Sequence, residues 1–109
     1  MDLTFALAKV DQQDPYEDTA NPVYKLRLFV TGASSVSVRA INNLQVILSE
    51  YLPEQYELEI IDAHQQPLLV KSENITAVPV LVKSFPGPKK HLIGDMSDKL
   101  KVLKGLGLT

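Results

Sequence analysis

The chain has 109 residues, of which 45% are hydrophobic and 22% charged, with a net charge of −2. This composition is typical of one ordinary globular domain, and it makes an intrinsically disordered chain a poor alternative. Because the sequence contains no cysteine, it excludes disulfides, thiolate nucleophiles and cysteine-based zinc sites. The apolar runs are too short to span a bilayer, and few aromatic residues accompany the scattered basic ones, so we expect neither membrane nor nucleic-acid binding.

The acidic charge is concentrated at the start of the chain. Residues 1–22 hold five acidic residues against Lys9, a net charge of −4, so the remainder carries +2. Residues 11–22, DQQDPYEDTANP, contain two prolines and almost nothing apolar, which predicts a flexible acidic arm before a domain at 23–109. The apolar stretch 3–8 is expected to be a loosely attached tail, with an added edge strand or an oligomer contact as alternatives. The start lacks the basic region of a secretory signal, which indicates a cytoplasmic protein.

Residues 23–62 follow a strand, helix, strand pattern. Side chains of residues 23–31 alternate between two faces, which predicts the first strand. Ser34 or Ser35 can cap a helix that we expect to end near Leu52, before Pro53. Its apolar stripe recurs at three- and four-residue spacing and consists of Ala40, Ile41, Leu44, Ile47, Leu48 and Tyr51. Residues 56–62 are the second strand, and a crossover helix between two strands implies that they are parallel.

The next segment contains a conflict. A short, weak helix is expected from Pro67 to about Glu73, with Leu68, Leu69 and Ile75 as its apolar residues. Residues 76–82 then read as a strand covered on both faces. Pro79 lies inside that strand, although proline donates no hydrogen bond and is normally confined to edge strands. A local rule broken inside a consistent element often marks a strained or functional position.

The end of the chain predicts a hairpin and a last helix. Residues 84–88 form a short connection to a strand at 89–94, as in an antiparallel pair. Ser97 can cap the last helix and Asp98 favours its positive end. We expect Leu100, Leu103 and Leu106 to form its buried stripe, and Gly105 and Gly107 to end it.

These elements predict an α/β domain of βαβαββα order with a mixed sheet and helices on both faces, which is the thioredoxin-like arrangement. Pro79 occupies the place of the cis proline at the start of that fold's third strand. A thiol oxidoreductase is nevertheless excluded, because residues 32–37, GASSVS, offer serines where redox chemistry needs Cys-x-x-Cys.

Five segments of the sequence resemble the KaiB family of bacterial circadian-clock proteins. They lie within residues 23–108, and their order and spacing make the resemblance specific. The segments are KLRLFVTG (25–32), SVRAINNL (37–44), LEIIDA (58–63), ENITAVPVLVK (73–83) and HLIGDMSDKLKVLKGLGL (91–108).

The resemblance implies a non-catalytic regulator, without a cofactor, that binds a KaiC-type ATPase and shares a system with a KaiB-binding histidine kinase. It also implies two folds: a ground-state fold with a rearranged C-terminal half, expected as a tetramer or dimer, and a monomeric thioredoxin-like fold that binds the ATPase. A general thioredoxin-like interaction module without redox activity is the alternative function, and a signalling or stress pathway is the alternative to a clock.

The resemblance also assigns candidate residues. Those that match the family's basic binding surface are Arg27, Arg39, Lys83 and Lys90, although a solvated charge is the ordinary role of a lone basic residue. Those expected to control the fold switch are Pro79, Pro86, Pro88, Gly94 and Asp95. Uncatalysed isomerisation of X-Pro bonds is slow, which makes the prolines candidates for a slow step.

Two features depart from the family pattern. KaiB proteins commonly have consecutive prolines where this chain has Pro86-Gly87-Pro88, and many carry an acidic C-terminal tail where this chain has an acidic N-terminal arm. The departures indicate a divergent branch.

His64 and His91 are 27 residues apart without metal-ligand spacing, and Asp62 with His64 is a weak acid–base pair without a nucleophile nearby. We therefore expect no metal site and no catalytic centre.

Overall fold

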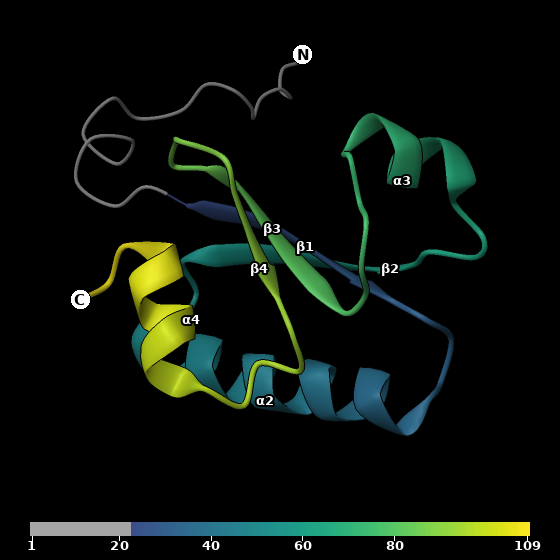
Figure 1. Ribbon diagram of the computed structural model, residues 1–109. Helices are drawn as coiled ribbons and strands as arrows, with labels where there is room; N and C mark the ends of the chain where they lie inside the picture. The colour runs from purple at the N-terminus through teal and green to yellow at the C-terminus, as the bar shows by residue number, and fades with distance from the viewer. Residues whose placement is uncertain (1–22) are drawn as a thin grey trace, which may run out of the picture.

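The computed structural model describes residues 23–109 (Figure 1). The predicted acidic arm at 1–22 lies outside the described residues. The elements of the described part are β1 (Tyr24–Val30), α2 (Ser35–Tyr51), β2 (Tyr56–Asp62), α3 (Pro67–Ser72), β3 (Val80–Phe85), β4 (Lys90–Ile93) and α4 (Lys99–Leu106). The predicted order of elements is confirmed.

The four strands form one mixed sheet in the order β2-β1-β3-β4. β1 and β2 are parallel, whereas β1 with β3 and β3 with β4 are antiparallel. Figure 1 shows α2 and α4 on one face of the sheet and α3 on the other. This is the thioredoxin-like α/β fold that the sequence predicts, with β1 and β3 in the middle of the sheet.

The alternation within β1 divides the core into two clusters. Leu26, Leu28 and Val30 pack with α2 and α4 in the larger cluster. Phe29 points to the other face, where it packs with Ile61, Val80 and Val82 beneath α3. Since successive side chains of a strand point to opposite faces, one strand supplies both clusters.

Serine hydroxyls close the turn between β1 and α2. The Ser34 side chain accepts a hydrogen bond from the Ser37 N–H (3.3 Å) and caps α2, as predicted. The buried Ser37 hydroxyl accepts from the Thr31 N–H (3.0 Å) and donates to the Thr31 carbonyl (3.3 Å). These bonds satisfy backbone groups that the end of β1 would otherwise leave unpaired.

Pro79 lies before β3 and not inside it, so the expectation of a proline within the strand is wrong. β3 begins at Val80, and the Pro79 carbonyl accepts a hydrogen bond from the Gly94 N–H (3.0 Å). Its missing N–H therefore removes no bond from the ladder. The Val78–Pro79 bond is cis, as expected from the fold, and the bonds before Pro86 and Pro88 are also cis.

The details of the two short helices differ from the expectation. Asp98, and not Ser97, caps α4 by accepting from the Lys101 N–H (3.2 Å). Leu100 is 68% exposed, and Val102 takes its expected place in the core. Leu68 is likewise 82% exposed. In helices this short, a shift of one residue in the start point rotates a different side chain towards the core.

Gly105 does not end α4 but lies within it, and Gly107 is the left-handed residue at the C-cap. A Cβ added at Gly105 would fall onto the Leu92 side chain of β4, 2.9 Å from its Cγ. The close approach of α4 to β4 therefore leaves no room for a side chain at position 105 unless Leu92 shifts.

We predict that Gly105→Ala lowers the free energy of unfolding by about 1 kcal/mol. Overpacking typically costs about 1–3 kcal/mol, and the better helix propensity of alanine returns up to about 1 kcal/mol. Urea unfolding at fixed protein concentration measures the change. In a Leu92→Ala background the same substitution should be neutral or stabilising, because the obstructing side chain is gone. Equal losses in both backgrounds would contradict the contact.

Candidate functional site

Arg27 lies on the face of β1 that α3 covers, where it bridges two carboxylates. Its Nε is 2.9 Å from Glu59 Oε1 on β2, and its Nη1 is 3.2 Å from Glu73 Oε2 at the end of α3. The alternation of β1 places Arg27 beside Phe29, on the opposite face from Leu26. The predicted binding residue is thus already paired within the domain.

Glu73 is the centre of this cluster. Its carboxylate also binds Lys89 Nζ at 2.8 Å, and its side chain is only 12% exposed. The hydrogen bond from Lys89 and the positive charges of Lys89, Arg27 and His91 lower the pKa of Glu73, against the opposing effect of burial. One carboxylate therefore connects α3, β1 and the β3–β4 connection.

Arg39 and Asp95 meet between α2 and the turn that precedes α4. Arg39 Nε is 3.4 Å from Asp95 Oδ2, and Asn43 Nδ2 donates to the Asp95 backbone carbonyl (3.0 Å). Asp95 Oδ1 accepts from the Ser97 N–H (3.1 Å), as expected for an aspartate in a turn. Hydrogen bonds from Ser97, followed by Arg39, lower the pKa of Asp95.

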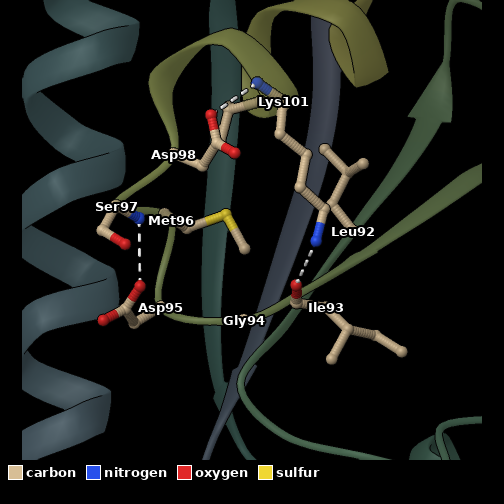
Figure 2. Close-up of a pocket in the computed structure, with 9 residues that line it drawn as sticks. Leu92, Ile93, Gly94, Asp95, Met96, Ser97, Asp98 and Lys101 are labelled. Atoms are coloured by element: carbon tan, nitrogen blue, oxygen red, sulfur yellow. Dashed lines mark hydrogen bonds between the residues drawn. The ribbon is translucent and has the colours of Figure 1, made fainter.

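The β4–α4 turn encloses a cavity of about 150 Å³ that is lined by residues 92–98, Lys101 and Val102. Figure 2 shows Lys101 crossing this turn, where its Nζ donates to the Ile93 carbonyl (3.1 Å). Gly94 has a φ of 127° and Met96 one of 63°, so the turn uses two residues with positive φ. Only glycine adopts the first without strain.

Lys83 and Lys90 face each other across β3 and β4. Lys83 is 5% exposed, and its Nζ donates to the Pro86 carbonyl (2.7 Å). Burial, followed by the positive charge of Lys90, lowers the pKa of Lys83. Among residues 23–109, no carboxylate forms an ion pair with either lysine.

The four predicted basic residues therefore do not share one surface. Lys83 pairs with Leu26 in the sheet register, which places it and Lys90 on the face of α2 and α4. Arg27 lies on the face of α3, and Arg39 projects from α2. Only Lys83 and Lys90 are brought together by the fold. Their roles in binding a partner stay predictions.

The sequence reasoning missed Glu73. Its partners Arg27 and Lys89 are 46 and 16 residues away in the chain, which no local pattern reveals. The one available signal was its position directly after a short helix that faces a strand with alternating basic residues.

Residues 23–109 contain no group of three histidine, aspartate or glutamate side chains that could hold a metal ion. Asp62 Oδ1 accepts from the backbone N–H of His64 (3.0 Å), so the contact between them is a turn bond. None of the helices in residues 23–109 has the length and apolar character needed to cross a membrane.

Comparison with known proteins identifies the fold's relatives. Residues 27–108 match the KaiB domain family. The chain belongs to the KaiB family. The family consists of non-catalytic clock proteins.

Two relatives illustrate the likeness. The circadian clock oscillator protein KaiB of Prochlorococcus marinus (strain MIT 9312) is 43% identical over 89 residues, covering 82% of this chain and 85% of the relative. The circadian clock protein KaiB3 of Synechocystis sp. (strain ATCC 27184 / PCC 6803 / Kazusa) is 46% identical over 83 residues, covering 76% and 81%.

Solved structures also resemble this KaiB-family domain. The N-terminal domain of Synechococcus elongatus SasA has a TM-score of 0.66 at 29% identity, covering 83% of this chain and 88% of that one. The Drosophila thioredoxin Deadhead has a TM-score of 0.64 at 12% identity, covering 87% and 90%, and shows the fold alone.

We predict that Glu73→Gln destabilises the domain at neutral pH by about 1 kcal/mol, because its partners are partly exposed and screened by solvent. The pKa of Glu73 is lower in the folded state. Its contribution is thus fully present above the pKa of the unfolded carboxyl, about 4.3, and is lost as pH falls through the folded value.

The free energies of unfolding of wild type and Glu73→Gln should therefore differ at pH 7 and converge in acid. Glu59→Gln is the matched control, because the Glu59 side chain is 66% exposed and, within residues 23–109, forms an ion pair only with Arg27. Glu59→Gln should lower the free energy of unfolding at pH 7 by less than Glu73→Gln does. Parallel stability curves for wild type and Glu73→Gln from pH 7 to pH 3 would contradict the role of Glu73.

Proposed function

We propose that this protein is a cytoplasmic, non-catalytic regulator that binds a KaiC-type ATPase, in a circadian clock or a related signalling or stress-response system. The observation that carries the proposal is the KaiB domain match over residues 27–108, which spans nearly all of the described domain. The chemistry of the domain is consistent with a binding role, since its charged residues form ion pairs and turns rather than an acid–base constellation.

The cationic residues are proposed to meet acidic residues of the ATPase. Lys90 is exposed, and its cross-strand partner Lys83 is buried, so this pair offers positive charge that no carboxylate of residues 23–109 neutralises in an ion pair. Arg39 is paired with Asp95 at 3.4 Å. On binding, it would exchange the Asp95 carboxylate for a carboxylate of the ATPase. Such contacts mainly speed encounter and set specificity, and they weaken with salt.

Arg27 is expected to contribute least directly. It would have to leave both Glu59 and Glu73 before it could bind an acidic partner. Its more direct effect is to hold α3 and β2 in place beside β1. We therefore rank the Lys83–Lys90 pair and Arg39 ahead of Arg27 as partner contacts.

A fold switch is part of the proposal. The thioredoxin-like arrangement described here is proposed as the ATPase-binding form, and a homo-oligomer with a rearranged C-terminal half as the ground state. Three contacts belong to the thioredoxin-like form: Gly94 N–H to the Pro79 carbonyl, Arg39 to Asp95, and Asn43 to the Asp95 carbonyl. Residues that make such state-specific contacts set the populations of the two states.

Five residues are proposed to control the switch. They are Pro79, Pro86, Pro88, Gly94 and Asp95, which lie before β3, between β3 and β4, and after β4. All three connections would have to change if the C-terminal half rearranged. Local preferences at these positions therefore bear directly on the ratio of the two folds.

A second function is favoured by the likeness to the N-terminal domain of SasA, at 29% identity and a TM-score of 0.66. On this reading the protein is a thioredoxin-like interaction module without redox activity, in a system that also contains a histidine kinase. Such a module would bind its partner without changing its own oligomeric state, which distinguishes it from the first proposal.

We predict that size-exclusion chromatography of the protein with a KaiC-type ATPase from the same organism yields a complex. The free protein should elute as a tetramer or dimer, and the bound protein should enter the complex as a monomer. Binding by an unchanged oligomer would favour the interaction module. Absence of a complex with ADP, with ATP and without nucleotide would refute the proposed partner.

We further predict that Gly94→Ala and Asp95→Ala change the ratio of oligomer to monomer. An L-residue at strongly positive φ costs roughly 1–2 kcal/mol in the fold that demands it, enough to change the ratio about tenfold. Asp95→Ala removes the bonds to Arg39 and Ser97. Analytical ultracentrifugation measures the ratio, and an unchanged ratio with unchanged ATPase binding in both variants would contradict their role.

A further inference from the structure

The outer face of α2, opposite the residues that it buries against the sheet, carries few charges. Val46 is 66% exposed and Val38 is 44% exposed on this face. Within Ser35–Tyr51, the charged residues are Arg39 and Glu50. The other exposed residues of this face are Ser35, Asn42, Gln45 and Ser49. Surface helices ordinarily present charged and polar residues to water, so two exposed valines on such a face are typical of a contact surface.

A shallow hollow lies in the middle of this face. It is lined by Asn42, Gln45, Val46, Ser49 and Glu50. The first four of these residues follow the spacing i, i+3, i+4, i+7. Four residues at that spacing surround the hole into which a side chain of a facing helix inserts. The outer face of α2 is therefore shaped to receive another helix.

The charges at the two ends of the face are complementary to each other. Arg39 and Glu50 are eleven residues apart, which is about three helical turns, so both lie on the same side of α2. Arg39 Nε is 3.4 Å from Asp95 Oδ2, and Glu50 Oε1 is 3.6 Å from Lys99 Nζ. The Arg39 and Glu50 side chains are still 57% and 55% exposed, so each can meet a second ion-pair partner.

We propose that two copies of this protein pair through the outer faces of α2, with the two helices antiparallel around a two-fold axis. The axis crosses α2 midway between Arg39 and Glu50, near Gln45. In such a symmetric interface each contact occurs twice, so Arg39 of each copy meets Glu50 of the other. The ion pairs then join into a network of alternating sign that runs from Asp95 of one copy to Lys99 of the other.

The same axis fills the hollow. Side chains of a helix lean towards its N-terminus, so Val46 of each copy lies over the hollow between Asn42 and Ser49 of the other. Burial of both valines favours the pair. A second copy also fits the charges better than a partner with an excess of one sign, which would attract one end of the face and repel the other.

The dimer should be weak. A helix of 17 residues presents a face about 25 Å long and about 10 Å wide. Two such faces bury less than the roughly 1,200 Å² of a stable complex, so we expect a monomer–dimer equilibrium that depends on protein concentration. If the proposed function holds, the dimer covers Arg39, and a second copy competes with the ATPase for this residue.

Charge reversal tests the contact in the full chain, without an ATPase. Arg39→Glu and Glu50→Arg each turn both attractions between the copies into repulsions, which should raise the Kd of the dimer about tenfold or more. Sedimentation equilibrium over a range of protein concentrations measures this constant. An equimolar mixture of the two variants should restore the dimer, because one variant then carries two acids on this face and the other carries two bases.

Glu57→Arg is the matched control. Glu57 lies on β2, is 67% exposed and pairs with Lys25, so its reversal should leave the Kd of the dimer unchanged. Three results would each overturn the proposal: wild type that stays monomeric at the concentrations used for NMR, Arg39→Glu and Glu50→Arg that sediment like wild type, or a mixture of these two variants as dissociated as its components.

A spin label tests the antiparallel arrangement. Because the sequence has no cysteine, Ser35→Cys creates a single site for a nitroxide at the start of α2. Mixing this protein with isotope-labelled wild type makes paramagnetic broadening report contacts between copies alone. The amide signals of Glu50 and Tyr51 should lose more intensity than those of Val38 and Arg39. Equal losses or the reverse order would overturn the arrangement.

These measurements are independent of the proposed function. The contact lies on α2, outside the C-terminal half that the proposed fold switch rearranges, and none of the experiments needs the ATPase. Their failure would therefore leave the proposed function to its own test.

Discussion

β1 is the element on which the rest of the structure depends, because it is hydrogen-bonded on both edges and buried on both faces. It pairs with β2 on one side and β3 on the other, while its side chains alternate between two clusters. A one-residue shift in its register would exchange the faces of every side chain. Both α2 and α3 therefore depend on the same seven residues for the surfaces they cover.

That constraint explains why much of the fold could be predicted from the sequence. Alternation in 23–31 and 56–62 and the apolar stripe of α2 are local patterns, and Ser34 caps α2 as its position suggested. The short elements were less certain because one residue changes their contacts. Asp98 replaces Ser97 as the cap, and Val102 replaces Leu100 in the core, since α4 has only eight residues.

The candidate site was less accessible to sequence reasoning. The resemblance to the KaiB family selected Arg27, Arg39, Lys83 and Lys90, but their surroundings depend on residues distant in the chain. Glu73 neutralises Arg27 and Lys89, Asp95 pairs with Arg39, and Lys83 and Lys90 have each other. Charge counting locates the excess of negative charge in residues 1–22, whereas only the fold shows which cations form an ion pair with a carboxylate of residues 23–109.

α3 has a consequence for the dynamics of the domain. None of its six residues is buried and no side chain caps its start, so it rests on the smaller cluster through partly buried contacts. Segments with few buried contacts open locally at low free energy while the rest of the domain stays folded. Opening of α3 would carry Glu73 away and expose the charges of Arg27 and Lys89 together. The surface charge of this domain is thus coupled to a local unfolding equilibrium.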